Sequence, residues 1–377
     1  MRKLTKLFAG AGAMLAAAAL VASTATTAMA DPPKGVVPRP IDIVGVGSDT
    51  TAFLLDQISH DYDAKVSAAA AHLYSWDATP PGSTSSAATK IKPKAGCPVT
   101  TRPDGSSAGV KALDANELDG TTGHYCIDYS RSSGGRSSTS PKLGPGGVAY
   151  VAFAKDAVTW ATRSTKHGGS DAPKSLSLTQ LEGIFKCTTT NWDQVGGKDA
   201  KITVFLPQAG SGTLSFWEKV MGITTLGSCV SQKPEENEGT YAGFNSPNAI
   251  FIYSVGDYVA QVYHSPVCGK APKAGQNLFG CNVTGYLQLD EINGVSPVTS
   301  AKVPVINYSK FPSEFIRTLY NVVRYSTTTA DHIPAYLESI FSAATAKVKG
   351  YLCTSAVAKA DIVDYGFINT SLCGTIS

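Results

Sequence analysis

The chain has 377 residues, in which 32 Lys and Arg oppose 29 Asp and Glu, for a formal net charge of +3. Three basic residues within positions 2–6 precede an apolar run, Leu7 to Ala22, and the small-residue site Ala28-Met29-Ala30 follows. This order is typical of a secretory signal peptide cleaved after Ala30. Removing residues 1–30 leaves as many basic as acidic residues, which argues against a nucleic-acid binder or a polybasic membrane-surface protein.

The remaining length exceeds the size at which single hydrophobic cores stop growing, so two domains are expected. No second apolar stretch reaches the roughly 18 residues that a membrane helix needs, so the mature chain is not expected to insert into a membrane. The first cysteine is Cys97, far from the cleavage site, so no lipid-attachment cysteine is available there. We therefore expect a secreted or periplasmic protein.

The eight cysteines of an exported chain predict disulfides, because the destination is oxidising. Eight cysteines permit 105 pairings, and the sequence alone does not choose among them. Sequential pairing keeps each bridge within one region, and it gives Cys97–Cys126, Cys187–Cys229, Cys268–Cys281 and Cys353–Cys373. Zinc is disfavoured because no C-x-x-C or H-x-x-x-H spacing occurs, and neither a metal nor a cofactor is expected.

Short apolar strands alternate with amphipathic helices along the chain. Strands are expected at Ile41–Val46, 127–131, Gly147–Ala154, Ile202–Leu206 and Ala249–Tyr253. Helices are expected at Thr50–Val66 (capped by Ser48 or Asp49), after Asp104, after the capping box Ser177-Leu-Thr-Gln180, after Gly210, at Ser313–Tyr325 and from Asp331. The alternation predicts an α/β protein with mostly parallel sheets flanked by helices.

Three glycine turns share one physical design: Gly47-Ser48-Asp49-Thr50, Gly105-Ser106-Ser107 and Gly210-Ser211-Gly212-Thr213. Each places small and hydroxyl residues at a helix start, where unpaired N–H groups and a partial positive charge hold anions. Glycine lets the backbone approach a ligand closely, and Ser or Thr hydroxyls add donors. Each turn alone could equally be a plain helix cap. The three together favour a shared anion pocket.

Five motifs follow one another along the chain: Gly45-x-Gly47, Gly-Ser-Ser-x-Gly-Val-Lys at 105–111, Asp-Tyr-Ser-Arg at 128–131, Asn-Trp-x-x-Val-Gly-Gly at 191–197 and Gly-Ser-Gly-Thr at 210–213. In this order they resemble the phosphate-binding proteins of phosphate ABC importers. This resemblance implies a two-lobed periplasmic-binding-protein-like fold of the type II solute-binding class, with the ligand in the cleft between the lobes. The first lobe would comprise residues 31–150 and 256–377, the second residues 151–255, with the strands near 147–154 and 249–253 as crossovers.

The resemblance further implies an extracytoplasmic solute-binding protein that captures phosphate or a related oxyanion, without catalysis, for an ABC permease. Its ligand contacts fall on Asp49, Thr50, Ser106, Ser211, Gly212 and Thr213. Two departures stand out, because the family carries an Asp where this chain has Arg131 and an Arg where it has Pro207. An exchange, with Arg131 as cation and Asp49 as proton acceptor, would keep a protonated oxyanion satisfied. A cleft binder needs no oligomer, so a monomer is expected.

Two alternatives remain open from the residues themselves. Gly105-Ser-Ser107-Ala-Gly109 fits the G-x-S-x-G nucleophile elbow, so a secreted serine hydrolase or esterase could use Ser107 or Ser211, with His264 or His332 as base. The segment before it contains Pro103 and makes a poor strand, which weakens this alternative. The other alternative is a binder of a different small ligand, in which the three turns are plain caps.

Overall fold

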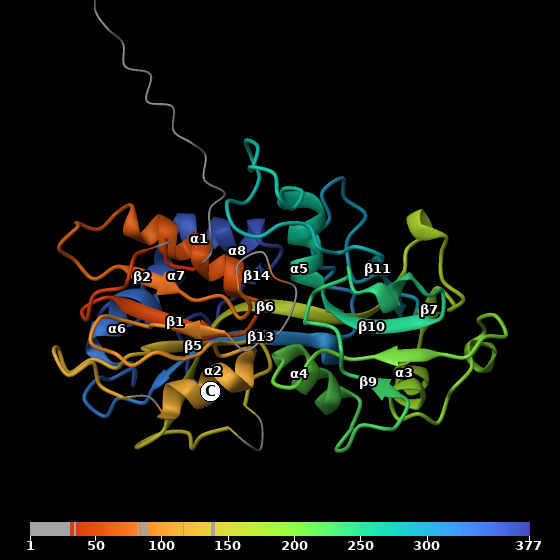
Figure 1. The fold of residues 1–377 in the computed structure, drawn as a ribbon, viewed down its shortest axis with the longest axis horizontal. Helices are drawn as coiled ribbons and strands as arrows, with labels where there is room; N and C mark the ends of the chain where they lie inside the picture. The colour runs from red at the N-terminus through yellow and green to blue at the C-terminus, as the bar shows by residue number, and fades with distance from the viewer. Residues whose placement is uncertain (1–30, 34, 81–82, 84–88, 116, 137–139) are drawn as a thin grey trace, which may run out of the picture.

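The computed structural model describes residues 31–33, 35–80, 83, 89–115, 117–136 and 140–377, so the predicted signal peptide lies outside the described residues. Within them, ten strands form one mixed sheet with helices on both sides (Figure 1). The main strand order is β2-β1-β5-β13-β6-β10-β8-β9, and β11 and β14 pair with β6. The fold is the predicted two-lobed α/β fold, with one lobe around β1, β2 and β5 and the other around β8, β9 and β10.

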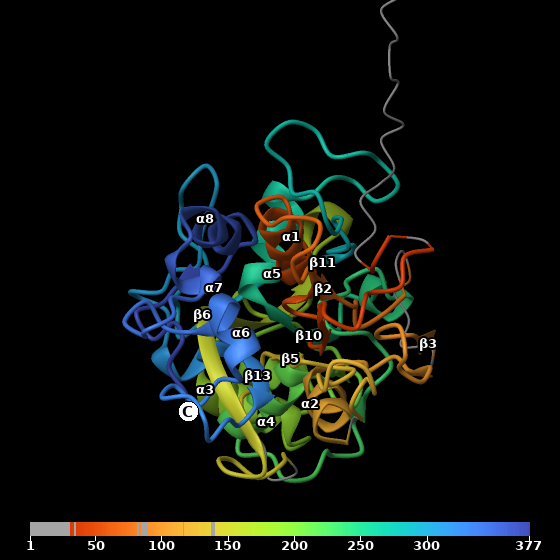
Figure 2. The same ribbon diagram turned by 90° about the vertical axis from the view of Figure 1, so that its left-hand side faces the viewer.

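The first lobe is built by segments from both ends of the chain (Figure 2). Its strands are β1 (Ile43–Gly47), β2 (Leu73–Ser75) and β5 (Tyr129–Ser132), with the short pair β3 (Lys90–Ile91) and β4 (Thr100–Thr101) beside them. Its helices are α1 (Ala52–Asp63), α2 (Ser106–Ala115), α6 (Ala335–Phe341), α7 (Tyr351–Thr354) and α8 (Ala356–Asp364), and β14 (Ile368–Asn369) follows α8.

The second lobe uses the middle of the chain. Its strands are β7 (Ser175–Leu176), β8 (Thr203–Phe205), β9 (Val230–Ser231), β10 (Ala249–Ser254), β11 (Leu287–Leu289) and β12 (Glu291–Ile292). Its helices are α3 (Leu178–Phe185), α4 (Gly212–Val220) and α5 (Val255–Val259), which continues as a π-helical turn, Ala260–His264. Single 3-10 turns lie at Thr165–His167, Trp192–Val195, Ala242–Asn245 and Ser313–Phe315.

Two long strands, β6 (Val148–Arg163) and β13 (Ile316–Arg324), run side by side through the centre (Figures 1 and 2). β6 pairs with β13 over Val148–Ala157 and then with β10 over Val158–Ala161, so one strand serves both lobes. All pairings of β6 with named strands are antiparallel, whereas β1 with β2 and β5, and β8 with β9 and β10, are parallel. The sheet is therefore mixed, and the expectation of mostly parallel pairing holds only in the outer strands of each lobe.

Each lobe has its own hydrophobic core. In the first, Leu54, Leu55 and Ile58 of α1 pack with Phe153 of β6 and Leu337 of α6, which accounts for the three- and four-residue spacing of apolar residues in α1. In the second, the three tryptophans Trp160, Trp192 and Trp217 are fully buried with α3 and α4. Ile306, Phe311 and Phe315 join this second core although they lie just before β13 in the sequence.

One predicted helix is wrong. Residues 313–325 contain apolar side chains at helical spacing, but the structure forms a single turn and then the strand β13. The segment Ile316–Arg324 carries β-branched residues and alternates in burial at its start, and it forms ladders with both β5 and β6. Pairing with two neighbouring strands stabilises this segment more than its weak amphipathic pattern would stabilise a helix.

The eight cysteines form the four pairs that sequential pairing gave: Cys97–Cys126, Cys187–Cys229, Cys268–Cys281 and Cys353–Cys373. The predicted capping box before α3 is also present, because Ser177 Oγ accepts the Gln180 N–H and Gln180 accepts the Ser177 N–H. The cap of α1 differs: its N-cap is Thr51, and neither Ser48 nor Asp49. In the described part of the chain, no helix combines the length and the apolar character that crossing a membrane requires.

Candidate functional site

The three glycine turns of the sequence each lead into a helix, as predicted. β1 is followed by the first turn and α1, Gly105 immediately precedes α2, and β8 leads through the third turn into α4. Gly47, Gly105 and Gly210 have φ of 113°, 86° and 97°, values that favour glycine. The site therefore lies where strands end and helices begin, the usual place for ligands in open α/β folds.

The turns from the two lobes touch each other. The Ser107 N–H donates to the Gly210 carbonyl oxygen at 3.1 Å, which joins the start of α2 to the turn before α4. A Cβ on Gly212 would lie 2.3 Å from Ser106 Oγ and 2.4 Å from Ser133 Oγ. Only glycine fits at this position, so the backbone at the start of α4 comes directly against hydroxyls of the first lobe.

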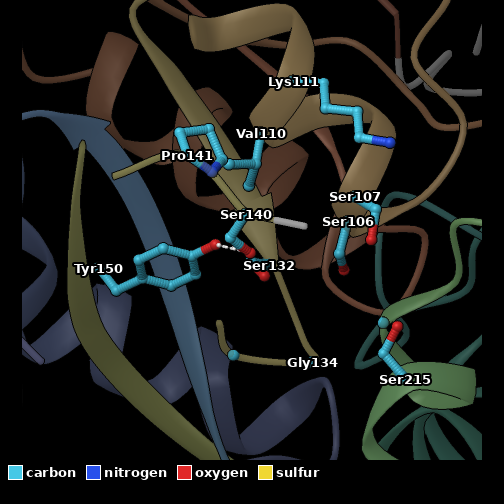
Figure 3. Close-up of a pocket in the computed structure, with 12 residues that line it drawn as sticks. Ser106, Ser107, Val110, Lys111, Ser132, Gly134, Ser140, Pro141, Tyr150 and Ser215 are labelled. Atoms are coloured by element: carbon cyan, nitrogen blue, oxygen red, sulfur yellow. Dashed lines mark hydrogen bonds between the residues drawn. The ribbon is translucent and has the colours of Figure 1, made fainter. Parts of the chain in front are cut away.

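A group of serines lines the first-lobe side of this contact. Ser106 Oγ accepts the Ser133 N–H at 3.1 Å, and Ser48 Oγ donates to Ser133 Oγ at 3.0 Å. Beside them is a cavity of about 10 Å³, roughly the space of one water molecule. Figure 3 shows Ser107 and Lys111 of α2 on one side of this cavity and Ser215 of α4 across from them.

The threonines of the first and third turns meet on a carboxylate. Thr50 Oγ1 and Thr213 Oγ1, 3.4 Å apart, both donate to Glu236 Oε1, and the Thr213 bond is 3.0 Å long. Asn237 also reaches Thr50 Oγ1, from its Nδ2 at 3.3 Å. The two hydroxyls expected to hold a ligand thus face an oxygen of the protein's own Glu236.

The cation at this place is Arg317 of β13. Its Nη1 donates to Thr213 Oγ1 at 2.8 Å, and its Nη2 lies 2.8 Å from Asp156 Oδ2 in an ion pair whose two side chains are at most 2% exposed. The other oxygen of Asp156 accepts the Gly256 N–H at 3.0 Å, so the carboxylate is held between β6, β13 and α5. The guanidinium is fixed by the two strands that both lobes share.

Arg131, expected as the cation, is placed differently. Its guanidinium is completely buried and donates to the carbonyl oxygens of Gly47, Ser48 and Trp76 and to Ser75 Oγ. These contacts tie the first turn to the end of β2. Among the described residues, its hydrogen bonds reach none of the other predicted ligand residues, and they hold the backbone of the first turn.

Four carboxyl groups gather next to the threonines: Asp49, Asp104, Glu235 and Glu236, here called the carboxylate cluster. Gln208 Nε2 donates to Asp104 Oδ1 at 3.2 Å and also to Glu235 Oε1, and the Glu236 N–H donates to Gln208 Oε1 at 2.9 Å. Burial, followed by the charge of Asp104, raises the pKa of Glu235 to about 10. Burial and the neighbouring Glu236 raise the pKa of Asp49 well above its usual range, and burial raises that of Asp104.

The structure thus brings Thr50, Ser106, Gly212 and Thr213 together and places Asp49 beside them. Ser211 caps α4, since its Oγ accepts the Leu214 N–H at 3.0 Å. The histidines considered for hydrolysis serve elsewhere: His332 Nδ1 lies 3.1 Å from the Ser326 carbonyl oxygen, and His264 ends the π-helical turn after α5. In the part of the chain that the structure describes, no group of three His, Cys, Asp or Glu could hold a metal ion.

Three residues at the candidate site were not predicted from the sequence: Ser133, Glu236 and Arg317. Ser133 lies only two residues beyond Arg131, and the Ser/Gly-rich loop was the available signal for it. Arg317 lies in the segment assigned to the wrong helix, where a charged residue within an apolar run was the only hint. Glu236 belongs to an irregular segment whose pattern contains no signal for this position.

The comparisons with known proteins agree with this fold. A family model of the PBP superfamily domain matches residues 80–279, more than half of the chain. In fold, the chain is similar to an ABC-type phosphate transport receptor from Vibrio cholerae, with a TM-score of 0.51 and 19% identity over 87% of this chain and 100% of that one. It is also similar in fold to a protein from Clostridium perfringens, assigned as a phosphate ABC transporter substrate-binding protein and solved with bound phosphate. The TM-score is 0.52, with 16% identity over 87% of this chain and 99% of that one. No curated protein sequence matches the chain.

Proposed function

The chain belongs to the PBP superfamily, and on that premise we propose that it is an extracytoplasmic solute-binding protein that captures phosphate or a related oxyanion between its lobes. The observation that carries the proposal is the meeting of α2 and α4, from opposite lobes, at the close contact of Gly212 with Ser106 and Ser133. Helix N-termini from two sides supply N–H donors and partial positive charge, the chemistry that an oxyanion requires.

The ligand set we propose keeps the residues expected from the sequence and changes the cation. On ligand binding, Thr50 and Thr213 turn their hydroxyl protons from Glu236 to the oxyanion. Ser106 donates a third hydroxyl hydrogen bond, and Ser211 and Gly212 contribute the N-terminal end of α4. Asp49, which lies beside these donors, accepts in its ionised form the hydrogen bond of a protonated oxyanion. Arg317 replaces Arg131 as the cation, because its guanidinium already contacts Thr213 Oγ1.

We propose that the mature chain acts outside the cytoplasm as a monomer and delivers its ligand to an ABC permease. The two solved structures named above are described as transport proteins of this kind, and four disulfides suit an oxidising location. Cleavage after Ala30 would release the chain without a lipid anchor.

The lobe boundaries are also a proposal. We place the second lobe at about residues 157–315, longer than the 151–255 expected from the sequence. The support is the packing of Ile306, Phe311 and Phe315 against Trp217 and its neighbours. On this proposal both crossings between the lobes run along β6 and β13, and β10 is a strand of the second lobe alone.

Calorimetric titration of the purified protein with phosphate, sulfate and arsenate tests the function. Micromolar affinity for one oxyanion, about −8 kcal/mol, is expected. Thr213→Val should weaken it at least tenfold, whereas Thr203→Val, on the exposed side of β8, should leave it unchanged. The proposal fails if no oxyanion produces binding heat below millimolar concentration.

A further inference from the structure

The proposed oxyanion site is lined on one side by carboxyl groups that form no ion pair with any described residue. The carboxylate cluster contributes four carboxyl groups, and Asp257 stands behind it, linked through Asn237 Nδ2 at 2.6 Å. Among the described residues, none of the ion pairs within 4 Å involves Asp49, Asp104, Glu235 or Glu236. The nearby guanidinium of Arg317 is already paired with Asp156. An oxyanion alone would bring no cationic donor to these carboxyl groups.

Two oxygens of this cluster are without donors. Glu235 and Glu236 are only 5% and 2% exposed, and among the described residues no N–H or hydroxyl group donates to Glu235 Oε2 or Glu236 Oε2. Asp104 lies within hydrogen-bond reach of Glu235, so these two carboxyl groups can share a proton. A buried carboxylate oxygen without a donor costs free energy comparable to a lost hydrogen bond or more. These two oxygens therefore need either protons or a cationic donor that arrives with the ligand.

The unpartnered oxygens lie next to the expected oxyanion donors. Glu236 uses its other oxygen, Oε1, to accept from Thr50 and Thr213. An oxyanion bound to those hydroxyls would be in contact with the Glu236 carboxyl group. A positive group attached to the same ligand, a few bonds away from the oxyanion, would lie against the carboxylate cluster.

Resting on the proposed function, we propose that the natural ligand is zwitterionic: a small phosphonate or phosphate monoester that carries a protonated primary amine. Its oxyanion binds the α2 and α4 N-termini and the Thr50 and Thr213 hydroxyls. Its ammonium group, with three donors, binds Glu235 Oε2 and Glu236 Oε2. The ammonium group supplies the cationic donor that inorganic phosphate lacks.

The cluster holds a proton when the site is free, because the pKa of Glu235 is raised to about 10 by burial and by Asp104. An ammonium group that takes the place of this proton releases it to solvent. Binding of the amine ligand should therefore release about one proton more at pH 7 than binding of an amine-free analogue. The carboxyl groups that face Glu235 are those of Asp49, Asp104 and Glu236.

The test compares 2-aminoethylphosphonate, ethylphosphonate and inorganic phosphate by calorimetry on the purified protein. We expect the aminophosphonate to bind at least tenfold tighter than ethylphosphonate. Glu236→Gln should reduce this preference at least fivefold, and Glu314→Gln, an exposed control outside the site, should preserve it. Titrations of the unmodified protein in two buffers of different ionisation enthalpy measure the proton release, so the test does not depend on the variant folding.

The possible failures are distinguishable. Equal affinity for the two phosphonates, with phosphate still bound at micromolar concentration, would overturn the zwitterion proposal and leave the proposed function intact. Phosphate binding that appears only on addition of Mg²⁺ would overturn it as well, since a metal ion would then neutralise the cluster. Absence of binding by all three compounds would remove the proposed function and this inference together.

Discussion

The ion pair between Arg317 and Asp156 should couple the stability of the protein to its binding site. Both side chains are at most 2% exposed, with Arg317 Nη2 and Asp156 Oδ2 2.8 Å apart. Replacing Arg317 with Met keeps much of the side-chain volume and removes the charge, so Asp156 is left buried without its cation. Ser254 Oγ and the Gly256 N–H would still donate to that carboxylate.

The expected cost is set by the uncompensated carboxylate. Removing one partner of a buried ion pair typically lowers the free energy of unfolding by about 3–5 kcal/mol. The two remaining donors to Asp156 place the expectation for Arg317→Met at the lower end, about 3 kcal/mol. In the double variant Arg317→Met/Asp156→Asn, neither position of this pair carries a charge, so most of the lost stability should be recovered.

Denaturant unfolding and calorimetry together separate the two roles of Arg317. The double variant should be nearly as stable as the parent protein, yet its phosphate affinity should fall at least tenfold because the cation of the site is missing. Arg163→Met, on β6 away from the site, serves as the charge-matched control and should retain affinity. A loss of less than about 1 kcal/mol in Arg317→Met would refute the buried-pair reasoning, and full affinity in the double variant would remove Arg317 from the site.

Three further predictions concern other parts of the molecule. Gly212→Ala should weaken oxyanion binding at least tenfold, because its Cβ would lie 2.3 Å from Ser106 Oγ and would push the two lobes apart. Unchanged affinity, together with solution scattering that shows no opening of the lobes, would contradict this prediction. Burial raises the pKa of Asp290 to about 7, so its contribution to stability is present at low pH and lost as pH rises from about 4 to 7. Asp290→Asn should then flatten the pH dependence of unfolding in that window, and an unchanged profile would exclude Asp290 as its source. The exported protein should begin at Asp31, which mass spectrometry can show. Asp31→Asn should lower the free energy of unfolding by about 1–3 kcal/mol, because it weakens the hydrogen bonds to Arg102. A variant as stable as the parent protein would contradict this stabilising role of Asp31.

The sequence predicted the local features well because they depend on neighbouring residues. The glycine turns, the capping box at Ser177 and the helix starts of α2 and α4 all follow from residues within one or two turns of chain. The four disulfides follow from proximity along the chain, with the most separated pair 42 residues apart. In each case the interaction that decides the structure is local.

What the sequence did not predict depends on contacts between distant segments. β13 was expected to be a helix because its apolar residues have helical spacing. The structure forms a strand there because the segment pairs with β5 and β6, roughly 160–190 residues earlier, and its own apolar pattern does not reveal this pairing. The role of Arg317 follows from that pairing, which places the residue opposite Asp156 of β6. The contacts of Arg131 were not predicted for the same reason, because its hydrogen bonds to the carbonyl oxygens of the first turn depend on the pairing of β5 with β1.

The division of the site between two lobes has a consequence for how binding would proceed. The donors on Thr50 and Ser106 belong to the first lobe and those on Gly212 and Thr213 to the second, so neither lobe alone offers the full set. Arg317 lies on β13, next to the strand that serves both lobes. A ligand that contacts both sides therefore favours the closed arrangement by the difference in its affinity for closed and open states. Because the groups involved are buried, and because the chain without residues 1–30 would carry no net charge, this attraction is local and should depend only weakly on ionic strength.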